Sequence, residues 1–196
     1  MLDEWRHLRD YLTHDGALPA IMQFQNGHPM WLPNLVFYPA FAFGGYDTSP
    51  IFLASLLVQL ATLGLLAACF WQSHRGWPGL FLLLLLVVVK LSLAASVTNF
   101  WSIGLHNYMC ETGLVAGLIG AVYLRGKRGV LVAVAGAIIA ALSFGFGIGV
   151  CAAIGVAFFL TGRRITGVAF ASLGTLIHLW FLSAFSIPTL SLIHIS

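Results

Sequence analysis

The stretch IFLASLLVQLATLGLLAACFW fills residues 51–71 and contains no charged side chain. An α-helix needs about 20 apolar residues to cross the hydrocarbon core of a bilayer. This segment is therefore long enough to span a membrane as a single helix. Five further apolar segments follow it, at residues 77–97, 109–124, 130–145, 147–160 and 165–187. The first two of the six and the last meet the length of a full span, whereas the other three are short.

The composition of the whole chain agrees with this first segment. Hydrophobic residues make up 60% of the 196 residues and charged residues only 8%, whereas soluble domains carry about 25% charged residues. So few charges cannot cover a surface that faces water, and the apolar segments must face lipid or one another. We predict an all-α fold in which residues 51–190 form a polytopic bundle of about six transmembrane helices.

Positive charges lie in alternate connections between the apolar segments. Six of the nine cations belong to this set: Arg75, Arg125, Lys127, Arg128, Arg163 and Arg164. The connections at 98–108 and 143–149 contain no Lys or Arg. Because cytoplasmic loops are enriched in these residues, we expect 72–76, 125–129 and 161–164 in the cytoplasm. The uncharged connections and residues 1–50 are then expected outside.

Residues 1–50 form a polar segment of different character. They hold five of the six acidic residues but only two of the nine cations, with many Pro, Gly, His and aromatic residues. We predict an extracytoplasmic segment that contains helices lying at the membrane interface. Because such a segment needs a hydrophobic helix to carry it across, we expect one upstream of Met1. Residues 191–196 have the character of a non-native tail and receive no functional interpretation.

Asp3 and Glu4 are the first candidate residues for chemistry. Carboxylate oxygens bind Mg²⁺ or Mn²⁺, and a carboxylate of suitable pKa acts as a general base. Neighbouring residues on a helix point in different directions, so ordinary solvated surface charge is the alternative. No set of metal ligands follows from the sequence.

His28 is the second candidate, within QFQNGHPMWLPNL at residues 23–35. Asn26 and Gly27 favour a turn, and the prolines at 29 and 33 oppose a regular helix through this stretch. A histidine held in such a turn at membrane level can contact a phosphate, bind a metal or transfer a proton. Capping of the turn is an equally good explanation.

Three ionisable residues within or beside apolar segments complete the candidate substrate site. Lys90 lies inside the second segment, where ionisable groups are usually paired or functional. It can pair with Glu111, extend its stem towards the interface or contact a lipid phosphate. His106 and Glu111 lie at the outer end of the third segment, on the side where we expect the polar N-terminal residues.

SFGFGIG at residues 143–149 has three glycines in seven positions. We expect a hairpin of two short helices there, whose glycines serve either close helix packing or a tip that lines a cavity. The three cysteines (Cys69, Cys110 and Cys151) have no paired or metal-binding spacing and are expected to be small core residues. Phosphate-binding loops, GxSxG, HExxH and nucleic-acid-binding patches are absent from the sequence.

The layout resembles the conserved half of bacterial GT-C glycosyltransferases, a family with a large first outer loop followed by further spans. The stretches that carry the resemblance are DEW (3–5), QNGHPMWLPNL (25–35), FGGYD (43–47) and SFGFGIG (143–149). The resemblance implies sugar transfer from a polyprenyl-phosphate donor on the outer face of the cytoplasmic (inner) membrane. It makes Asp3 or Glu4 the catalytic base or a contact for Mg²⁺ or Mn²⁺. From position alone, we add His28 and Lys90 as candidates for the lipid phosphate.

Two other hypotheses remain open from the sequence. In a transporter, Lys90, Glu111 and the glycine-rich hairpin would line a pathway. In a non-enzymatic subunit of a membrane complex, the weakly polar helices would pack against partner helices.

Overall fold

The structure is a computed structural model that describes residues 16–22, 24–25, 28–44, 47–73, 76–90, 104–143 and 147–184. Within these ranges the chain is helical apart from a two-residue β-ladder and short turns. The elements are α2 (Ala17–Ile21), β1 (Phe24–Gln25), β2 (His28–Pro29), α3 (Trp31–Gly44), α4 (Ser49–Ser73), α5 (Trp77–Lys90), α7 (Leu105–Val122), α8 (Gly126–Ser143), α9 (Gly147–Leu160) and α10 (Arg164–Ala184). The prediction of an all-α fold is confirmed.

Each of the six apolar segments contains a helix, from α4 to α10, and the hairpin expected near residues 143–149 is formed by α8 and α9. Glycines occupy the turns after α4, α7 and α9. Gly76, Gly126 and Gly162 have φ angles of 96°, 61° and 83°. Glycine adopts this left-handed region at little cost, which explains why the chain reverses direction at these points.

Among the described residues, two helices are long and apolar enough to cross a membrane. They are α4, with 25 residues and a mean hydropathy of 2.2, and α8, with 18 residues and a mean hydropathy of 1.5. By this measure two spans are supported rather than the predicted six. The helices α5 and α9 have 14 residues each, or about 21 Å of helix. The first half of α7 carries polar residues that lower its hydropathy.

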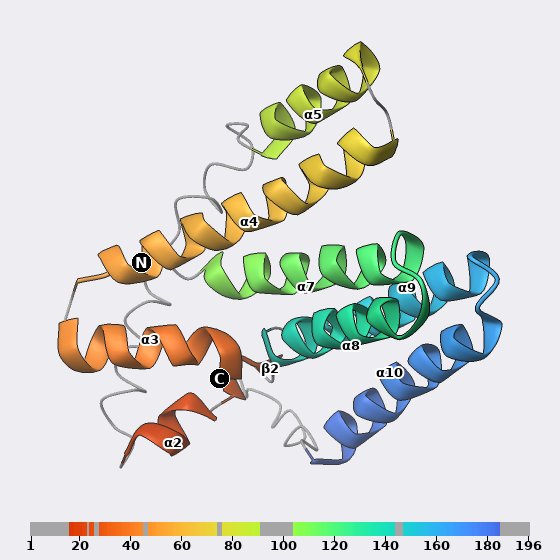
Figure 1. Ribbon diagram of the computed structural model, residues 1–196. Coiled ribbons are helices and arrows are strands. Elements are labelled where there is room, and N and C mark those ends of the chain that lie inside the picture. The colour runs from red at the N-terminus through yellow and green to blue at the C-terminus, as the bar shows by residue number, and fades with distance from the viewer. Residues whose placement is uncertain are drawn as a thin grey trace, which may run out of the picture.

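The antiparallel pair α7 and α8 forms the centre of the bundle, with α4 and α9 packed against α7 and α10 against α9 (Figure 1). Glycines bring α7 and α8 into backbone contact. A methyl group added at Gly120 would lie 2.5 Å from the carbonyl oxygen of Gly129 and 2.7 Å from the amide nitrogen of Ala133. Small residues permit such close approach between helices in lipid, so α8 uses its glycines for helix packing.

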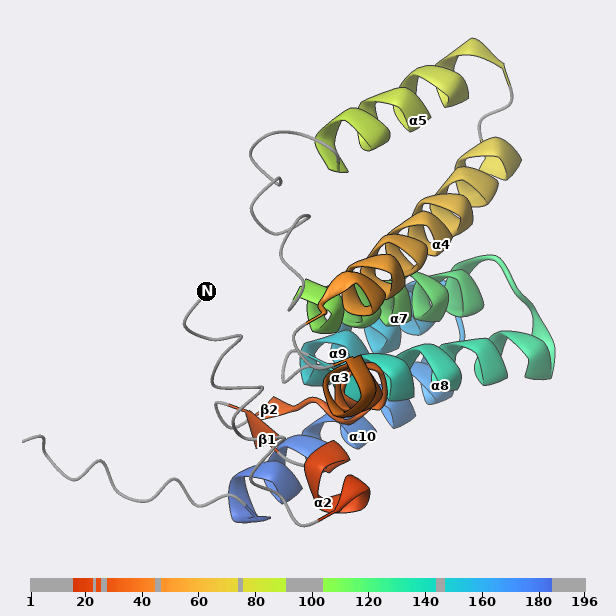
Figure 2. The ribbon, with the colours of Figure 1, turned by 90° about the vertical axis from the view of Figure 1, so that its left-hand side faces the viewer.

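The turns that follow α4, α7 and α9 lie at one end of the bundle, as Figures 1 and 2 show. The hydroxyl groups of Ser73 and Tyr123 are 2.8 Å apart, which joins the first of these turns to the second. Arg163 donates hydrogen bonds to the carbonyl oxygens of Ala121 and, at 3.2 Å, of Leu124. These two bonds join the turn after α7 to the turn after α9. The connections that contain Arg125, Lys127, Arg128, Arg163 and Arg164 therefore gather at the same end, and their location in the cytoplasm stays a prediction.

The described part of the N-terminal segment lies at the opposite end. Phe37 and Phe41 of α3 pack with Ile51 at the start of α4 and Leu105 at the start of α7. Strands β1 and β2 pair antiparallel, with Phe24 opposite Pro29 and Gln25 opposite His28, on either side of the turn expected at residues 26–27. Helices are present in this segment, as predicted.

The expectation that Pro29 and Pro33 oppose a regular helix holds for Pro29, which lies in β2, but is wrong for Pro33. Helix α3 begins at Trp31 and contains Pro33 in its first turn. A proline is tolerated there because the first backbone N–H groups of a helix have no intrahelical acceptor. The start of α3 is held to α2 by the side-chain amide of Asn34, which donates to the carbonyl oxygen of Ile21 at 2.9 Å.

Candidate functional site: an apolar groove

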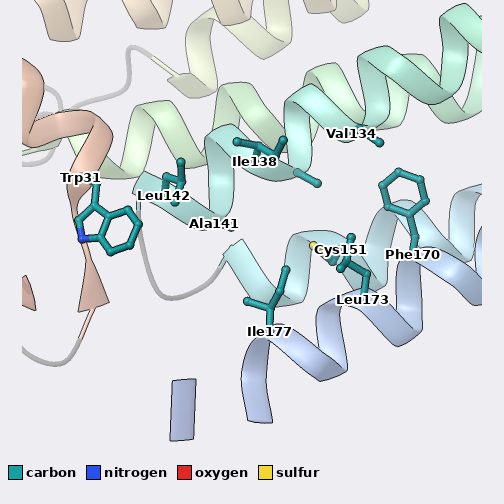
Figure 3. A pocket seen from close by; sticks show the side chains of 10 residues that line it. Trp31, Val134, Ile138, Ala141, Leu142, Cys151, Phe170, Leu173 and Ile177 are labelled. Atoms are coloured by element: carbon teal, nitrogen blue, oxygen red, sulfur yellow. The ribbon is translucent and has the colours of Figure 1, made fainter. Parts of the chain in front are cut away.

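An apolar groove of about 300 Å³ opens between α8, α9 and α10, with one residue of α3 at its end. Figure 3 shows it from close by. Its lining consists of Trp31, Val134, Ala137, Ile138, Ala141, Leu142, Cys151, Phe170, Leu173 and Ile177. Every one of these side chains is apolar except for the indole nitrogen of Trp31 and the thiol of Cys151.

The two walls come from one face of α8 and one face of α10. Ile138 and Leu142 are four residues apart on α8, and Leu173 and Ile177 are four apart on α10, the spacing that aligns side chains along one helical face. Cys151 of α9, with 1% of its surface exposed, lies between the walls. About half of the surfaces of Ile138 and Leu173 remains exposed, so the groove is open along its length.

Phe170 and Trp31 mark the two ends of the groove (Figure 3). The ring of Phe170 is buried and its centroid is 5.2 Å from that of Phe158, which anchors it against α9. Trp31 lies beside Leu142, and its indole N–H donates to the carbonyl oxygen of Met22 at 2.9 Å. The N-terminal segment therefore positions the aromatic ring that ends the groove.

This lining suits a hydrocarbon chain, and its one nucleophilic group, the thiol of Cys151, belongs to a residue with 1% of its surface exposed. Moving a methylene group from water into such a site is worth about 0.8 kcal/mol. For a hydrocarbon chain that already lies in a bilayer, this transfer free energy largely vanishes. Any favourable free energy of binding then comes from van der Waals packing against the side chains of the groove. The groove therefore offers an apolar surface, and the described candidate residues lie outside its lining.

Of the described candidate residues, His28 belongs to an element that contacts a wall of the groove. It is part of β2, which contacts α8, and it stands three residues before Trp31. Lys90 is the last residue of α5, a helix that contacts α4 on the far side of the bundle (Figure 2). Asp3 and Glu4 lie outside the described residues. Their catalytic assignment stays a prediction.

His106 and Glu111 do not line the groove. Both belong to α7, where His106 is buried, with 8% of its surface exposed, and Glu111 is half-buried. They are five residues apart, so their side chains leave the helix about 140° from each other. The structure therefore does not bring these two candidates together on one face of α7.

Three of the residues that shape the groove were not assigned to one from the sequence. Cys151 was expected to be a small core residue, and no signal in the sequence singled out Trp31 or Phe170 for a groove. The burial of Cys151 and Cys110 confirms the core prediction for them, whereas Cys69 is half-buried. Among the described residues, no three His, Cys, Asp or Glu side chains lie together in a way that would hold a metal ion.

Comparison with known proteins gave no match to a family model, to a curated protein or to a solved structure.

Proposed function

We propose that this chain is a multi-pass integral membrane protein that acts on a lipid-linked substrate, and that it transfers a sugar from a polyprenyl-phosphate donor. The observation that carries the proposal is the position of the apolar groove. It lies between α8 and α10 and ends at Trp31, in the same N-terminal segment that supplies the polar candidate residues.

Membrane embedding is supported by the surface of the helices and by the placement of the cations. Large apolar side chains such as Phe81, Leu131 and Leu176 expose more than 60% of their surface, which lipid would cover. The cation-rich turns share one end of the bundle. In the proposed topology of six spans, the positive-inside rule puts that end in the cytoplasm. The N-terminal segment and the Trp31 end of the groove then face the outside.

In the proposed reaction, the hydrocarbon chain of the donor occupies the groove and its phosphate lies at the Trp31 end. His28 is the candidate for contact with that phosphate, because a cation in a poorly hydrated site binds it well. Lys90 was a second candidate from the sequence, but α5 packs against α4 and not against the groove helices. His106 and Glu111 are candidates for further contacts with the substrate. Asp3 or Glu4 would act as the base that removes the acceptor's proton, or as a contact for Mg²⁺ or Mn²⁺.

The packing of α7 against α8 supports this proposal over a transporter. A pathway through the centre of the bundle would need space between these helices. Instead, a methyl group at Gly113 would lie 2.5 Å from the carbonyl oxygen of Gly136 and 2.8 Å from the amide nitrogen of Ala140. The groove, by contrast, opens on the side of the bundle, where a lipid chain enters from the bilayer.

A photoactivatable polyprenyl-phosphate analogue tests the groove. Ile138→Trp fills the groove, whereas Leu131→Trp places the same ring on the same face of α8 two turns earlier, at an exposed position outside the lining. We expect Ile138→Trp to lose crosslinking and sugar transfer and Leu131→Trp to keep both. Crosslinking of Ile138→Trp at the level of the unchanged protein would contradict the proposal.

The catalytic assignment has its own test. Asp3→Asn and Glu4→Gln are expected to stop sugar transfer while crosslinking to the groove persists. Transfer that survives in the double variant would overturn the roles given to these two residues and leave the groove unaffected.

Topology is tested with single cysteines in a background in which Cys69, Cys110 and Cys151 are replaced. A membrane-impermeant thiol reagent should label Asn26→Cys in intact cells. It should label Lys127→Cys only after the membrane is permeabilised. The reverse pattern would place the Trp31 end in the cytoplasm and rule out sugar transfer on the outer face.

A further inference from the structure

A second hollow lies at the opposite end of the bundle, between the turn after α7 and the turn after α9. It encloses about 530 Å³ and is lined by Val122, Arg125, Gly126, Thr161 and Arg163. This basic depression contains two guanidinium groups and a hydroxyl group, whereas the groove contains no charged side chain. The proposed sugar transfer makes no use of it.

Arg163 forms a fixed wall of the basic depression. Its guanidinium group donates to the carbonyl oxygens of Leu124 and Ala121 and lies 4.5 Å from the centre of the Phe158 ring. A guanidinium group has five N–H donors, so these two acceptors leave others for a ligand. Because the position of Arg163 is set by protein contacts, its charge is in place before a ligand arrives.

Arg125 and Gly126 form the open side of the depression. The side chain of Arg125 is exposed, and no hydrogen bond or ion pair joins it to another described residue. Gly126 contributes no side chain, and no atom lies within 4 Å of the position where a Cβ would stand. A ligand can therefore reach both arginines from the solvent side without moving the backbone.

The electrostatic field around the basic depression favours an anion. Lys127, Arg128 and Arg164 add three cations to the two that line it, and the first turn of α8 has no acidic residue to balance the positive end of its dipole. The described acidic residues are Asp47, at the opposite end before α4, and Glu111. Glu111 precedes the end of α7 by 11 residues, or about 16 Å.

We propose that the basic depression binds the phosphate of an anionic phospholipid headgroup. Arg125 and Arg163 contact the phosphate, and the acyl chains lie against the apolar side chains beside it. Val122 of α7, Leu160 of α9 and Ile165 of α10 expose 50%, 79% and 89% of their surfaces at this end. Their apolar surface next to fixed cations matches a phospholipid better than a free phosphate ion. Basic pockets between helices on the cytoplasmic side of membrane proteins bind such lipids. The proposal depends on membrane embedding and is independent of sugar transfer.

Lipid retention measured by native mass spectrometry tests the proposal, using the full chain purified from neutral detergent with phosphatidylglycerol or phosphatidylcholine added. The unchanged protein should retain phosphatidylglycerol in preference to phosphatidylcholine. Arg125→Gln should weaken that retention roughly tenfold, the effect of losing one charge-assisted hydrogen bond. Arg164→Gln removes the same charge from the same end without touching the lining, and it should change retention by less than twofold.

Three outcomes would overturn the proposal. Equal retention of the two lipids would show that no anion is preferred. Equal losses in Arg125→Gln and Arg164→Gln would show that diffuse charge attracts the lipid, without a defined site. Displacement of phosphatidylglycerol by an equal concentration of inorganic phosphate would show that the depression recognises the free ion and not a lipid. Circular dichroism of both variants, compared with the unchanged protein, confirms that each is folded.

Discussion

The contact between α7 and α8 makes a sharp prediction about a single methyl group. In Gly120→Ala, the new Cβ would lie 2.5 Å from the carbonyl oxygen of Gly129, about 0.9 Å short of an ordinary contact of 3.4 Å. The same Cβ would lie 2.7 Å from the amide nitrogen of Ala133. Both neighbours are backbone atoms and cannot rotate away, so the two helices must separate. Overpacking of this kind costs about 1–3 kcal/mol.

Gly64→Ala is the matched control, because Gly64 lies within α4 and has no atom within 4 Å of its Cβ position. Both substitutions gain about 0.5–1 kcal/mol of helix propensity. The difference between the two unfolding free energies therefore isolates the packing cost, and we expect Gly120→Ala to be about 1–3 kcal/mol less stable than Gly64→Ala. Unfolding by SDS in mixed micelles, followed by tryptophan fluorescence, measures it. Equal stability of the two variants would refute the close contact of α7 and α8.

Three further predictions follow from single contacts. Arg163→Gln should lower the unfolding free energy by about 1.5–3 kcal/mol, because the charged group that donates to the last carbonyl oxygens of α7 is lost. Arg164→Gln should change the unfolding free energy little. An equal effect of the two substitutions would contradict this prediction. Hydrogen bonds from the hydroxyl group and then from the backbone amide of Ser49 hold the pKa of the exposed Asp47 carboxyl below its usual 3.8. Their stabilising contribution should be complete above pH 3.8 and disappear as the pH falls below it, a decline that Asp47→Asn should lack in pH titrations of stability. The hydroxyls of Thr62 and Thr112, 2.5 Å apart, should show a coupling energy of about 0.6 kcal/mol in a double-mutant cycle of Thr→Val variants; a coupling of zero would show that α4 and α7 do not meet there.

The order of the helices could be predicted from the sequence because bilayer-length apolar runs and cationic turns are local signals. The segment 51–71 corresponds to α4, and the turn glycines stand where the chain reverses. The ends of the helices were less predictable. Helix α7 begins at Leu105, four residues before the predicted segment, because polar residues such as His106 and Asn107 are helical here and buried or half-buried. A hydropathy pattern assigns such residues to a loop.

The groove could not be predicted, because nearly uniform apolar helices carry no periodic signal that distinguishes one face from another. Ile138 lines the groove and Leu131 does not, although they are apolar residues of the same helix. The difference arises from where α9 and α10 lie relative to α8, which depends on contacts between residues far apart in the sequence. Trp31 reaches the groove because its indole N–H bonds the carbonyl oxygen of Met22 and fixes the ring beside α8.

The cation-rich end shows why counting charges in loops is not sufficient to describe what they do. All six cations in the alternate connections have the same weight in the positive-inside rule. In the structure, Arg163 is committed to the carbonyl oxygens at the end of α7, where the helix dipole is negative and the last turn of α7 has no basic residue of its own. Arg125, in contrast, has no described hydrogen-bond partner and lies open at the same depression. Substitutions at Arg163 should therefore affect folding first, whereas substitutions at Arg125 should affect lipid binding in a protein that remains folded. A variant series at these two arginines separates the structural role of the basic end from its role as a surface for lipid.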